Sequence, residues 1–293
     1  MKILITGSNG LLGQKLVRQL LKSNVPFLAT SKGENRNVDC PQELYVELDI
    51  CNENEIELLF TLFHPTHIIH TAAITNVDYC ELNPVECNEV NFKASLKLFE
   101  AAKKTNAHFQ LLSTDFVFDG LKGNYQEEDA VGPLSVYAVS KVNAENALIN
   151  DTYRNWSIVR TIIVYGIGHN LSRSNIICWA KDVLSKEQDI TIVNDQFRSP
   201  TWADDLAWAC LRICKLNEKG IFHISGPETM SIFELVNRIA KHFNLPTGKI
   251  KAISSSQLNQ AANRPPKTGF NLTKSKEKIG YSPKILEETL DLI

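Results

Sequence analysis

The sequence predicts an α/β fold in which helices cover both faces of a doubly wound parallel sheet and a smaller C-terminal α/β lobe follows. Two observations predict it. Short apolar segments alternate with segments of helical periodicity over residues 1–166, and such alternation is typical of a parallel sheet with crossover helices. Glycine-rich punctuation follows the first apolar segment directly, as it does at the ligand edge of such sheets.

The chain opens with an apolar strand and a glycine-rich turn. Residues 3–5 form a run suited to a strand buried on both faces, and Gly7, Gly10 and Gly13 follow it. A helix that begins near Leu11 would point its positive end at an anion. The segment therefore predicts a dinucleotide site. Its spacing is GxxGxxG rather than GxGxxG, so a tight turn without a ligand is the alternative.

The same alternation continues to residue 166. Further strands are expected at residues 26–30, 43–49, 67–73, 109–113 and 157–164. Helices are expected at residues 14–22, 53–63, 88–104 and 134–150. The carboxyl ends of these strands should meet at one edge of the sheet, where such folds place their ligand cleft.

The second half of the chain is less regular. Helices are expected at residues 174–184, 204–214 and 231–242, and short strands within residues 190–200 and 221–225. Ser231 is placed to cap the last of these helices, with Glu234 three residues on. Because no flexible linker separates the halves, we expect a cofactor domain (1–166), joined by a returning segment near 201–225, interleaved with a substrate lobe (167–293).

Composition favours an ordinary soluble globular protein. The 293 residues are 43% hydrophobic, which allows a large core, and the net charge of -2 gives no positive field to hold nucleic acid. No apolar run is long enough for a membrane helix, and the run behind Met1 is too short for a secretory signal. We therefore expect a cytoplasmic location, with neither nucleic acid nor membrane as a partner.

Cysteine and histidine patterns predict no metal site. The seven cysteines are scattered without a CxxC pair, so we expect reduced thiols. His64, His67 and His70 resemble a metal cluster at first sight. Since side chains of a strand alternate between its faces, His67 and His70 should point to opposite sides and cannot converge on one ion.

A tyrosine and a lysine four residues apart carry the predicted chemistry. Tyr137 and Lys141 share one face of the helix expected at residues 134–150. A neighbouring ammonium favours the phenolate and should lower the pKa of the phenol. Tyr137 could then protonate a carbonyl oxygen as hydride reaches the carbon. Thr114, at the end of a strand, would bond the same oxygen, and Asp115 would relay the proton or orient the substrate.

With these residues in place, the chain resembles the extended short-chain dehydrogenase/reductase superfamily and, within it, the dTDP-4-dehydrorhamnose reductase family. The resemblance spans nearly all 293 residues. Besides the glycines and the YxxxK pair, it rests on TAAITNVDYCE (71–81), STDFVFDG (113–120), NDQFRSPTWADDLA (194–207) and RPP (264–266). It implies a Rossmann sheet with a small α/β lobe, and reduction of the 4-keto group of a nucleotide-linked deoxysugar.

The resemblance also implies roles for single residues. Thr114, Tyr137 and Lys141 match the catalytic triad, with Asp115 beside them. The pyrophosphate loop, the adenine contact, the wall near the nicotinamide and a central-helix asparagine are matched by Gly7, Asn9, Gly10, Leu11, Leu12, Asp49, Ile50, Ala72, Ala73, Thr75 and Asn91.

The segment after the second strand bears on the choice of cofactor. NAD-preferring relatives carry an acidic residue there, whereas this chain has Thr30, Ser31 and Lys32, with Arg36 nearby. A carboxylate would repel a 2′-phosphate, but hydroxyls and an ammonium would accept one. We therefore expect NADP(H) to be preferred and NAD(H) to be possible, with a solvated polar loop as the alternative.

The substrate side is less defined. Ile163 stands where the reductase family often has a Trp, so the identity of the sugar stays open. A nucleotide sugar also needs cations for its diphosphate, and the planar fork of arginine suits phosphate oxygens. The candidates are Arg173, Arg198, Arg264 and Lys267. Arg264 is favoured because the two prolines that follow would hold it on a stiff segment.

Two other functions stay open. An epimerase or dehydratase of the same superfamily would keep its cofactor bound through a whole cycle. A non-catalytic regulatory subunit is the other alternative, since one relative of the family serves methionine adenosyltransferase in that way. Intact Thr114, Tyr137 and Lys141 favour catalysis, because a regulatory protein need not retain all three. A homodimer is expected only from the habits of the superfamily.

Overall fold

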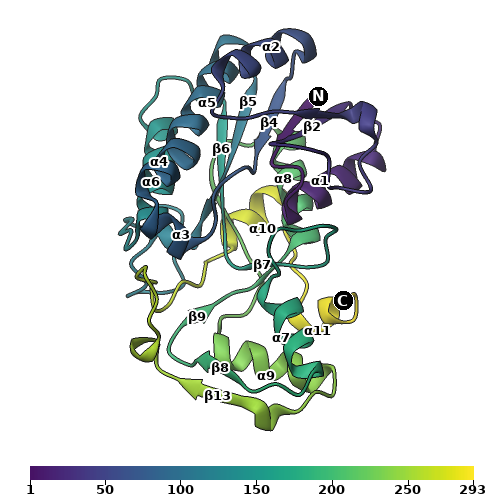
Figure 1. Cartoon of the computed structure of the whole chain (residues 1–293). Coiled ribbons are helices and arrows are strands. Elements are labelled where there is room, and N and C mark those ends of the chain that lie inside the picture. Colours follow the sequence, from purple (N-terminus) through teal and green to yellow (C-terminus); the bar gives the residue numbers. More distant parts are fainter.

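The main body of the protein is a seven-stranded parallel sheet, seen in a computed structural model that describes residues 1–293 (Figure 1). Its order is β11-β6-β5-β4-β1-β2-β3. The strands are β1 (Ile3–Thr6), β2 (Phe27–Ser31), β3 (Tyr45–Glu47), β4 (His67–His70), β5 (His108–Thr114), β6 (Trp156–Thr161) and β11 (Gly220–Ile224). The order reverses between β1 and β4, the point at which folds of this type bind their ligands beyond the carboxyl ends of the strands. This is the Rossmann-type α/β fold that the sequence predicts.

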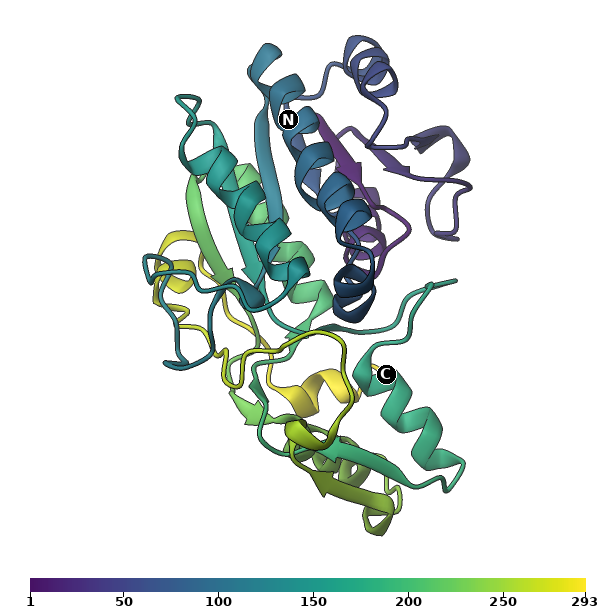
Figure 2. The same ribbon diagram turned by 60° about the vertical axis from the view of Figure 1, so that its left-hand side comes forward.

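Helices cover both faces of this sheet, as the alternation of segments predicts. They are α1 (Leu11–Leu21), α2 (Glu53–Phe63), α3 (Val77–Leu82), α4 (Pro84–Asn88), α5 (Ala94–Lys104), α6 (Val136–Ile149) and α8 (Ala203–Leu216). Ile3 and Ile5 pack under α1 and α8, whereas Leu4 packs under α2 and α5. Figure 2 shows α5 (blue) and α6 (teal) side by side over the second face. The first apolar run is therefore buried on both sides.

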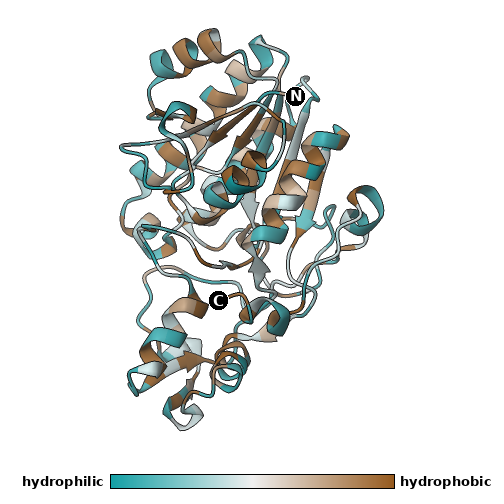
Figure 3. Cartoon of the chain, turned by 90° about the vertical axis from the view of Figure 1, so that its right-hand side faces the viewer, coloured by the Kyte–Doolittle hydropathy of each residue, from teal (hydrophilic) through white to brown (hydrophobic).

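The smaller lobe lies below the carboxyl edge of the sheet (Figures 1 and 3). It contains α7 (Ile176–Ser185), β8 (Ile190–Val193), β9 (Phe197–Arg198), β12 (Met230–Ser231), α9 (Ile232–His242), β13 (Ile250–Ile253) and α11 (Leu286–Leu290). β8 pairs with β13 in parallel, and β9 pairs with β12 in antiparallel fashion. Helix α9 packs on β8, β13 and α7, and together they close an apolar core.

The chain crosses between these two parts more than once. It leaves the sheet at β7 (Val164–Tyr165), passes through α7, β8 and β9, and returns through β10 (Thr201–Trp202) to α8 and β11. β10 pairs with β7, and β11 extends the main sheet beside β6. Helix α10 (Thr273–Ile279) then packs against β11. Segments far apart in the chain are thereby brought to the same edge of the sheet.

Several expected elements form with small changes in length. The Ser231 hydroxyl accepts a hydrogen bond from the Glu234 amide at 3.0 Å and caps α9 as expected. The strand expected at residues 157–164 is instead broken into β6 and β7. Ile163, between them, has a φ of 33°, a left-handed conformation that a β-branched residue adopts only under strain. The helix expected at residues 88–104 contains a π-helical turn at Glu89–Lys93.

The histidines and cysteines have local partners. His70 is buried between the hydroxyls of Thr6 (2.7 Å) and Ser95 (2.9 Å), whereas His67 bonds Thr66. The two histidines thus meet different neighbours, as the alternation of strand side chains requires. All seven cysteines are free, and no group of acidic, histidine or cysteine side chains is arranged to hold a metal ion. None of the helices combines the length and the apolar character needed to cross a bilayer.

A buried ion pair joins the sheet to α6. Arg160, at the end of β6, donates to both carboxylate oxygens of Glu145 at 3.0 and 2.7 Å, and both side chains are 2% exposed. The guanidinium also donates to the Glu127 carbonyl and lies over the ring of Phe118. Because α6 carries Tyr137 and Lys141, this pair fixes the helix that bears the predicted chemistry.

Candidate active site

Two glycines of the turn after β1 have no room for a side chain. Gly7 has a φ of +74°, and a Cβ there would lie 2.6 Å from the amide nitrogen of Ala72. A Cβ on Gly13 would lie 2.4 Å from the Gly7 carbonyl oxygen. Gly10 is the N-cap of α1 and offers no capping side chain, so the first amide groups of the helix are open to an anion. The residues present therefore fit the pyrophosphate of a dinucleotide.

Asn9 ties this turn to the segment after β2. Its amide nitrogen donates to the Ser31 hydroxyl at 3.0 Å, and its side chain donates to the Glu34 carbonyl at 2.8 Å. The side-chain oxygen of Asn9 accepts from the Arg36 amide at 2.8 Å. The pyrophosphate turn and the segment expected to meet the adenosine ribose therefore form one unit.

The residues expected to select the cofactor differ in exposure and in their hydrogen-bond partners. Thr30 is fully buried and its hydroxyl donates to the Ile5 carbonyl at 3.0 Å. The prediction that its side chain contacts the cofactor is therefore wrong. Ser31 remains next to Asn9. Lys32 is 79% exposed and lies 2.7 Å from Asp49, a carboxylate expected near the adenine. This contact raises the pKa of Lys32 and lowers that of Asp49.

The other predicted cofactor contacts line the same edge of the sheet with varied exposure. Half-buried are Leu11, Leu12, Ala72 and Ala73, whereas Thr75 is exposed and Ile50 is buried in the core beneath α2. Ala72 is in direct contact with Gly7. The contact expected from the Ile50 side chain is therefore limited to the little surface that the core leaves open.

Asn91 supports the site from inside the protein. It is fully buried in the π-helical turn, and its side chain accepts from the Ile74 amide at 2.8 Å and donates to the Ile74 carbonyl at 3.0 Å. It also donates to the Ser140 hydroxyl at 3.2 Å, on α6. Asn91 thus fastens the loop after β4 to the helix that carries the YxxxK pair.

Tyr137 and Lys141 lie one turn apart on α6, and both are nearly fully buried. Burial raises the pKa of Tyr137, and the Thr114 hydroxyl opposes this only in part. The expected lowering of this pKa is wrong, because loss of hydration outweighs other influences on the phenol. Burial lowers the pKa of Lys141 to about 8, against the opposing charge of Glu145. At neutral pH Tyr137 therefore holds its proton.

We expect turnover to fall as pH rises through about 8. The ammonium of Lys141, which would stabilise the phenolate formed on Tyr137, is lost above its pKa of about 8. A pH profile of kcat should be flat below this value and decline about tenfold per unit above it. Lys141→Arg, which stays charged, should keep a flat alkaline limb at lower kcat. A wild-type profile flat to pH 9.5 would contradict this role.

Asp115 has partners within the protein on both carboxylate oxygens. The Thr114 hydroxyl donates to Oδ1 at 3.0 Å, and the Thr268 hydroxyl donates to Oδ2. Arg198 lies 3.6 Å from Oδ2. The carboxylate is buried, which raises its pKa while Arg198 opposes the rise. Direct orientation of the substrate by Asp115 is therefore not supported.

The cations expected to hold a diphosphate are in three different situations. Arg173 and Lys267 are exposed. Arg264 is half-buried and donates to both oxygens of Asp78 at 3.1 and 2.6 Å. Arg198 is 2% exposed and donates to three backbone carbonyls. The prediction that Arg198 contacts a phosphate is therefore wrong, since its N–H donors are used inside the protein.

Comparison with known proteins decides the family. A family model described as RmlD substrate binding domain matches residues 1–293. The chain belongs to this family. It is 30% identical over 298 residues to a dTDP-4-dehydrorhamnose reductase from Aggregatibacter actinomycetemcomitans. The alignment covers 96% of the chain and 94% of that protein.

Two further relatives of this RmlD-family chain carry names with different functions. Methionine adenosyltransferase 2 subunit beta from Bos taurus is 29% identical over 269 residues, covering 90% of the chain and 78% of that protein. A crystal structure of dTDP-4-dehydrorhamnose reductase from Bacillus anthracis in complex with NADP superposes with a TM-score of 0.86 at 26% identity, covering 100% of the chain and 98% of that structure. The family resemblance is thus confirmed, and the chain is an NAD(P)H-dependent oxidoreductase.

Some residues of this RmlD-family site are not evident from the sequence. The side chain of Gln14, on α1, donates to the His169 carbonyl at 2.7 Å and accepts from the His169 amide at 2.8 Å. This holds a loop of the smaller lobe over the glycine turn. Asp78 and Thr268 are likewise unpredicted, because their partners Arg264 and Asp115 lie 186 and 153 residues away. No local spacing signals such contacts.

Proposed function

We propose that the chain is an NADPH-dependent reductase of the 4-keto group of a nucleotide-linked deoxysugar, of the dTDP-4-dehydrorhamnose reductase type, in nucleotide-sugar synthesis for polysaccharides. The observation that carries the proposal is the buried pair Tyr137 and Lys141 beside Thr114, at the sheet edge that also bears the glycine turn. The full-length similarity to a dTDP-4-dehydrorhamnose reductase supports the same class of substrate.

The residues would divide the chemistry as follows. Bound NADPH would supply the hydride to the carbonyl carbon. Tyr137, whose raised pKa keeps it protonated, would give its proton to the carbonyl oxygen. To orient that oxygen, the Thr114 hydroxyl would turn its proton from Asp115 Oδ1 to the carbonyl. The Lys141 ammonium would stabilise the phenolate that remains. The glycine turn and the free amides of α1 would hold the pyrophosphate.

The preference for NADPH is proposed to depend on Ser31 and Lys32. Lys32→Ala should lower kcat/KM for NADPH about tenfold and leave that for NADH unchanged, since an ammonium bonds a 2′-phosphate and not a hydroxyl. Steady-state kinetics with both cofactors measure this. Lys22→Ala, which removes an exposed lysine at the other end of α1, is the control. An equal fall for both cofactors would mean that Lys32 does not read the phosphate.

On the substrate side we propose that Arg173 and Arg264 meet the diphosphate. Arg264 would have to share its fork with Asp78 or exchange that carboxylate for phosphate oxygens. The proposed division of labour gives residues 1–166, with the returning segment 201–225, to the cofactor and residues 167–293 to the nucleotide sugar. A cytoplasmic location and a homodimer stay predictions.

The test couples oxidation of NADPH to a panel of nucleotide 4-ketosugars that differ in base and in sugar. Stoichiometric oxidation with at least one of them is the expected result. Isomerised or dehydrated product without net oxidation would indicate the epimerase or dehydratase alternative. The similarity to methionine adenosyltransferase 2 subunit beta favours a regulatory role as the second candidate. Tight NADPH binding without turnover of any substrate would support that reading and contradict ours.

A further inference from the structure

A segment of the C-terminal part of the chain crosses the substrate side of the site. We name residues 264–271 the strap. Its backbone is bonded on both sides: the Phe197 amide donates to the Pro266 carbonyl at 2.7 Å, and the Lys267 amide donates to the Gly120 carbonyl at 3.2 Å. The strap therefore joins β9 of the smaller lobe to the loop that follows the end of β5.

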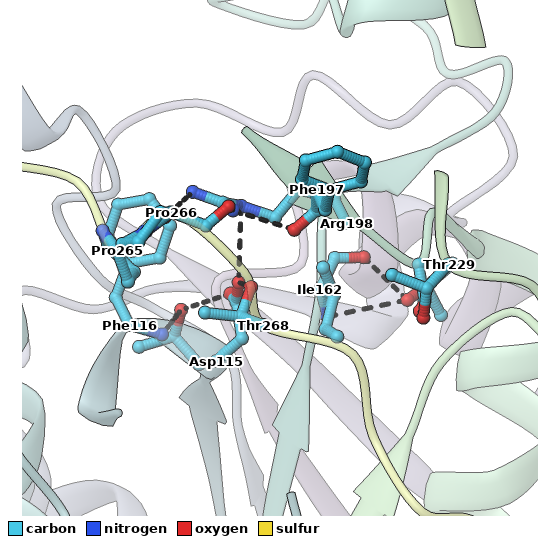
Figure 4. A network of polar contacts seen from close by, with 12 residues as sticks. Asp115, Phe116, Ile162, Phe197, Arg198, Thr229, Pro265, Pro266 and Thr268 are labelled. Atoms are coloured by element: carbon cyan, nitrogen blue, oxygen red, sulfur yellow. Dashed lines mark hydrogen bonds and ion pairs between the residues drawn. The ribbon is translucent and has the colours of Figure 1, made fainter. Parts of the chain in front are cut away.

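Arg198 fixes the strap from beneath. Its guanidinium donates to the Pro265 carbonyl at 2.6 Å and to the Pro266 carbonyl at 3.2 Å, and also to the Phe197 carbonyl at 2.8 Å (Figure 4). Proline carbonyls on a stiff segment are good fixed acceptors for the planar fork. With its side chain 2% exposed, Arg198 is in effect part of the interior.

The same network reaches Thr114. Figure 4 shows Asp115 between Arg198 and Thr268. Its Oδ2 lies 3.6 Å from Arg198 Nε and accepts from the Thr268 hydroxyl, while Oδ1 accepts from the Thr114 hydroxyl at 3.0 Å. Since Thr268 belongs to the strap and is fully buried, its hydroxyl sets where the carboxylate sits. The carboxylate in turn sets the orientation of Thr114.

A second route reaches Tyr137. The guanidinium of Arg198 lies 5.4 Å from the centre of the Phe116 ring, within the range of a cation–π contact. The Phe116 ring meets the Tyr137 ring edge-on, with centres 6.2 Å apart at 76°. Arg198 is therefore linked to both hydroxyls of the proposed mechanism, through Asp115 to Thr114 and through Phe116 to Tyr137.

We propose that Arg198 and Thr268 are positioning residues, which hold Thr114 and Tyr137 in reacting geometry through Asp115 and Phe116. The kinetic test of this inference rests on the proposed function, whereas the exchange test does not. A buried carboxylate needs its partners, because a lost hydrogen bond leaves it free to move or to rotate away. A displacement of about 1 Å at a catalytic group can cost about a hundredfold in rate.

The test replaces Thr268 by valine, which keeps the shape and removes the hydroxyl. We expect kcat to fall about 10- to 100-fold with KM for NADPH unchanged, and Thr268→Ser to restore kcat to within about threefold. Thr289→Val is the matched control, because Thr289 is equally buried but lies on α11, away from Asp115. Its hydroxyl is hydrogen-bonded to the Tyr165 hydroxyl and donates to the Leu286 carbonyl. It should lose stability without losing kcat. If Thr268→Val does not fold, Arg198→Lys is measured in the same way.

A second readout needs no substrate. Hydrogen–deuterium exchange of the NADPH-bound protein should rise in Thr268→Val at residues 114–118 as well as in the strap, and should not rise there in Thr289→Val. Unchanged exchange at residues 114–118 would overturn the inference, as would a higher KM for the nucleotide sugar at unchanged kcat. If no ketosugar is reduced by the wild type, the proposed function fails, while the exchange result still decides the positioning role.

Discussion

Replacing Tyr137 by phenylalanine should lower kcat for ketosugar reduction by about 10² to 10⁴-fold, the usual contribution of a positioned general acid. The phenol is buried and its raised pKa keeps the proton on it at neutral pH, so the proposed proton donor is present and is lost in the variant. Stopped-flow oxidation of NADPH at saturating substrate measures the loss. Binding of NADPH should be unchanged, because the ring itself remains.

Tyr153→Phe is the matched control for this change. This substitution also removes a hydroxyl that is hydrogen-bonded inside the protein. The Tyr153 hydroxyl donates to the Ala107 carbonyl at 2.8 Å, away from the carboxyl edge of the sheet. Its kcat should stay within about twofold of the wild type, as for substitutions remote from a site. Unchanged kcat in Tyr137→Phe would remove the proposed proton donor and with it the mechanism.

Arg160→Met should destabilise the protein by about 3–5 kcal/mol, because it leaves the carboxylate of Glu145 buried without its cation. Urea unfolding followed by circular dichroism measures the free energy of unfolding. The double variant with Glu145→Met should be more stable than Arg160→Met alone, since two apolar side chains leave no unpaired charge. Equal losses in the single and double variants would show that packing, rather than charge, accounts for the effect.

Much of the fold follows from local patterns in the chain. The apolar run before Gly7 predicts a strand buried on both faces, and the helical spacing after Leu11 predicts α1. Ser231 and Glu234 predict the start of α9 within one residue. These features depend on interactions between residues close in sequence, so the sequence displays them directly.

Elements with weak local signals could not be predicted. β13 is a four-residue strand that exists because β8 offers it a parallel edge. The break between β6 and β7 arises because Val164 and Tyr165 pair with β10 instead of continuing beside β5, which forces Ile163 into a left-handed conformation. Both outcomes depend on partners far along the chain.

By itself the sequence determined the Rossmann-type sheet, the family, the glycine turn and the single helix face that carries Tyr137 and Lys141, because spacing within a strand, turn or helix sets them. Only the tertiary structure decided that Thr30 is enclosed and that Arg198 serves Asp115 rather than a phosphate. It also decided the directions of the pKa shifts. Burial and long-range pairing govern these properties, and neither exists until distant segments pack together.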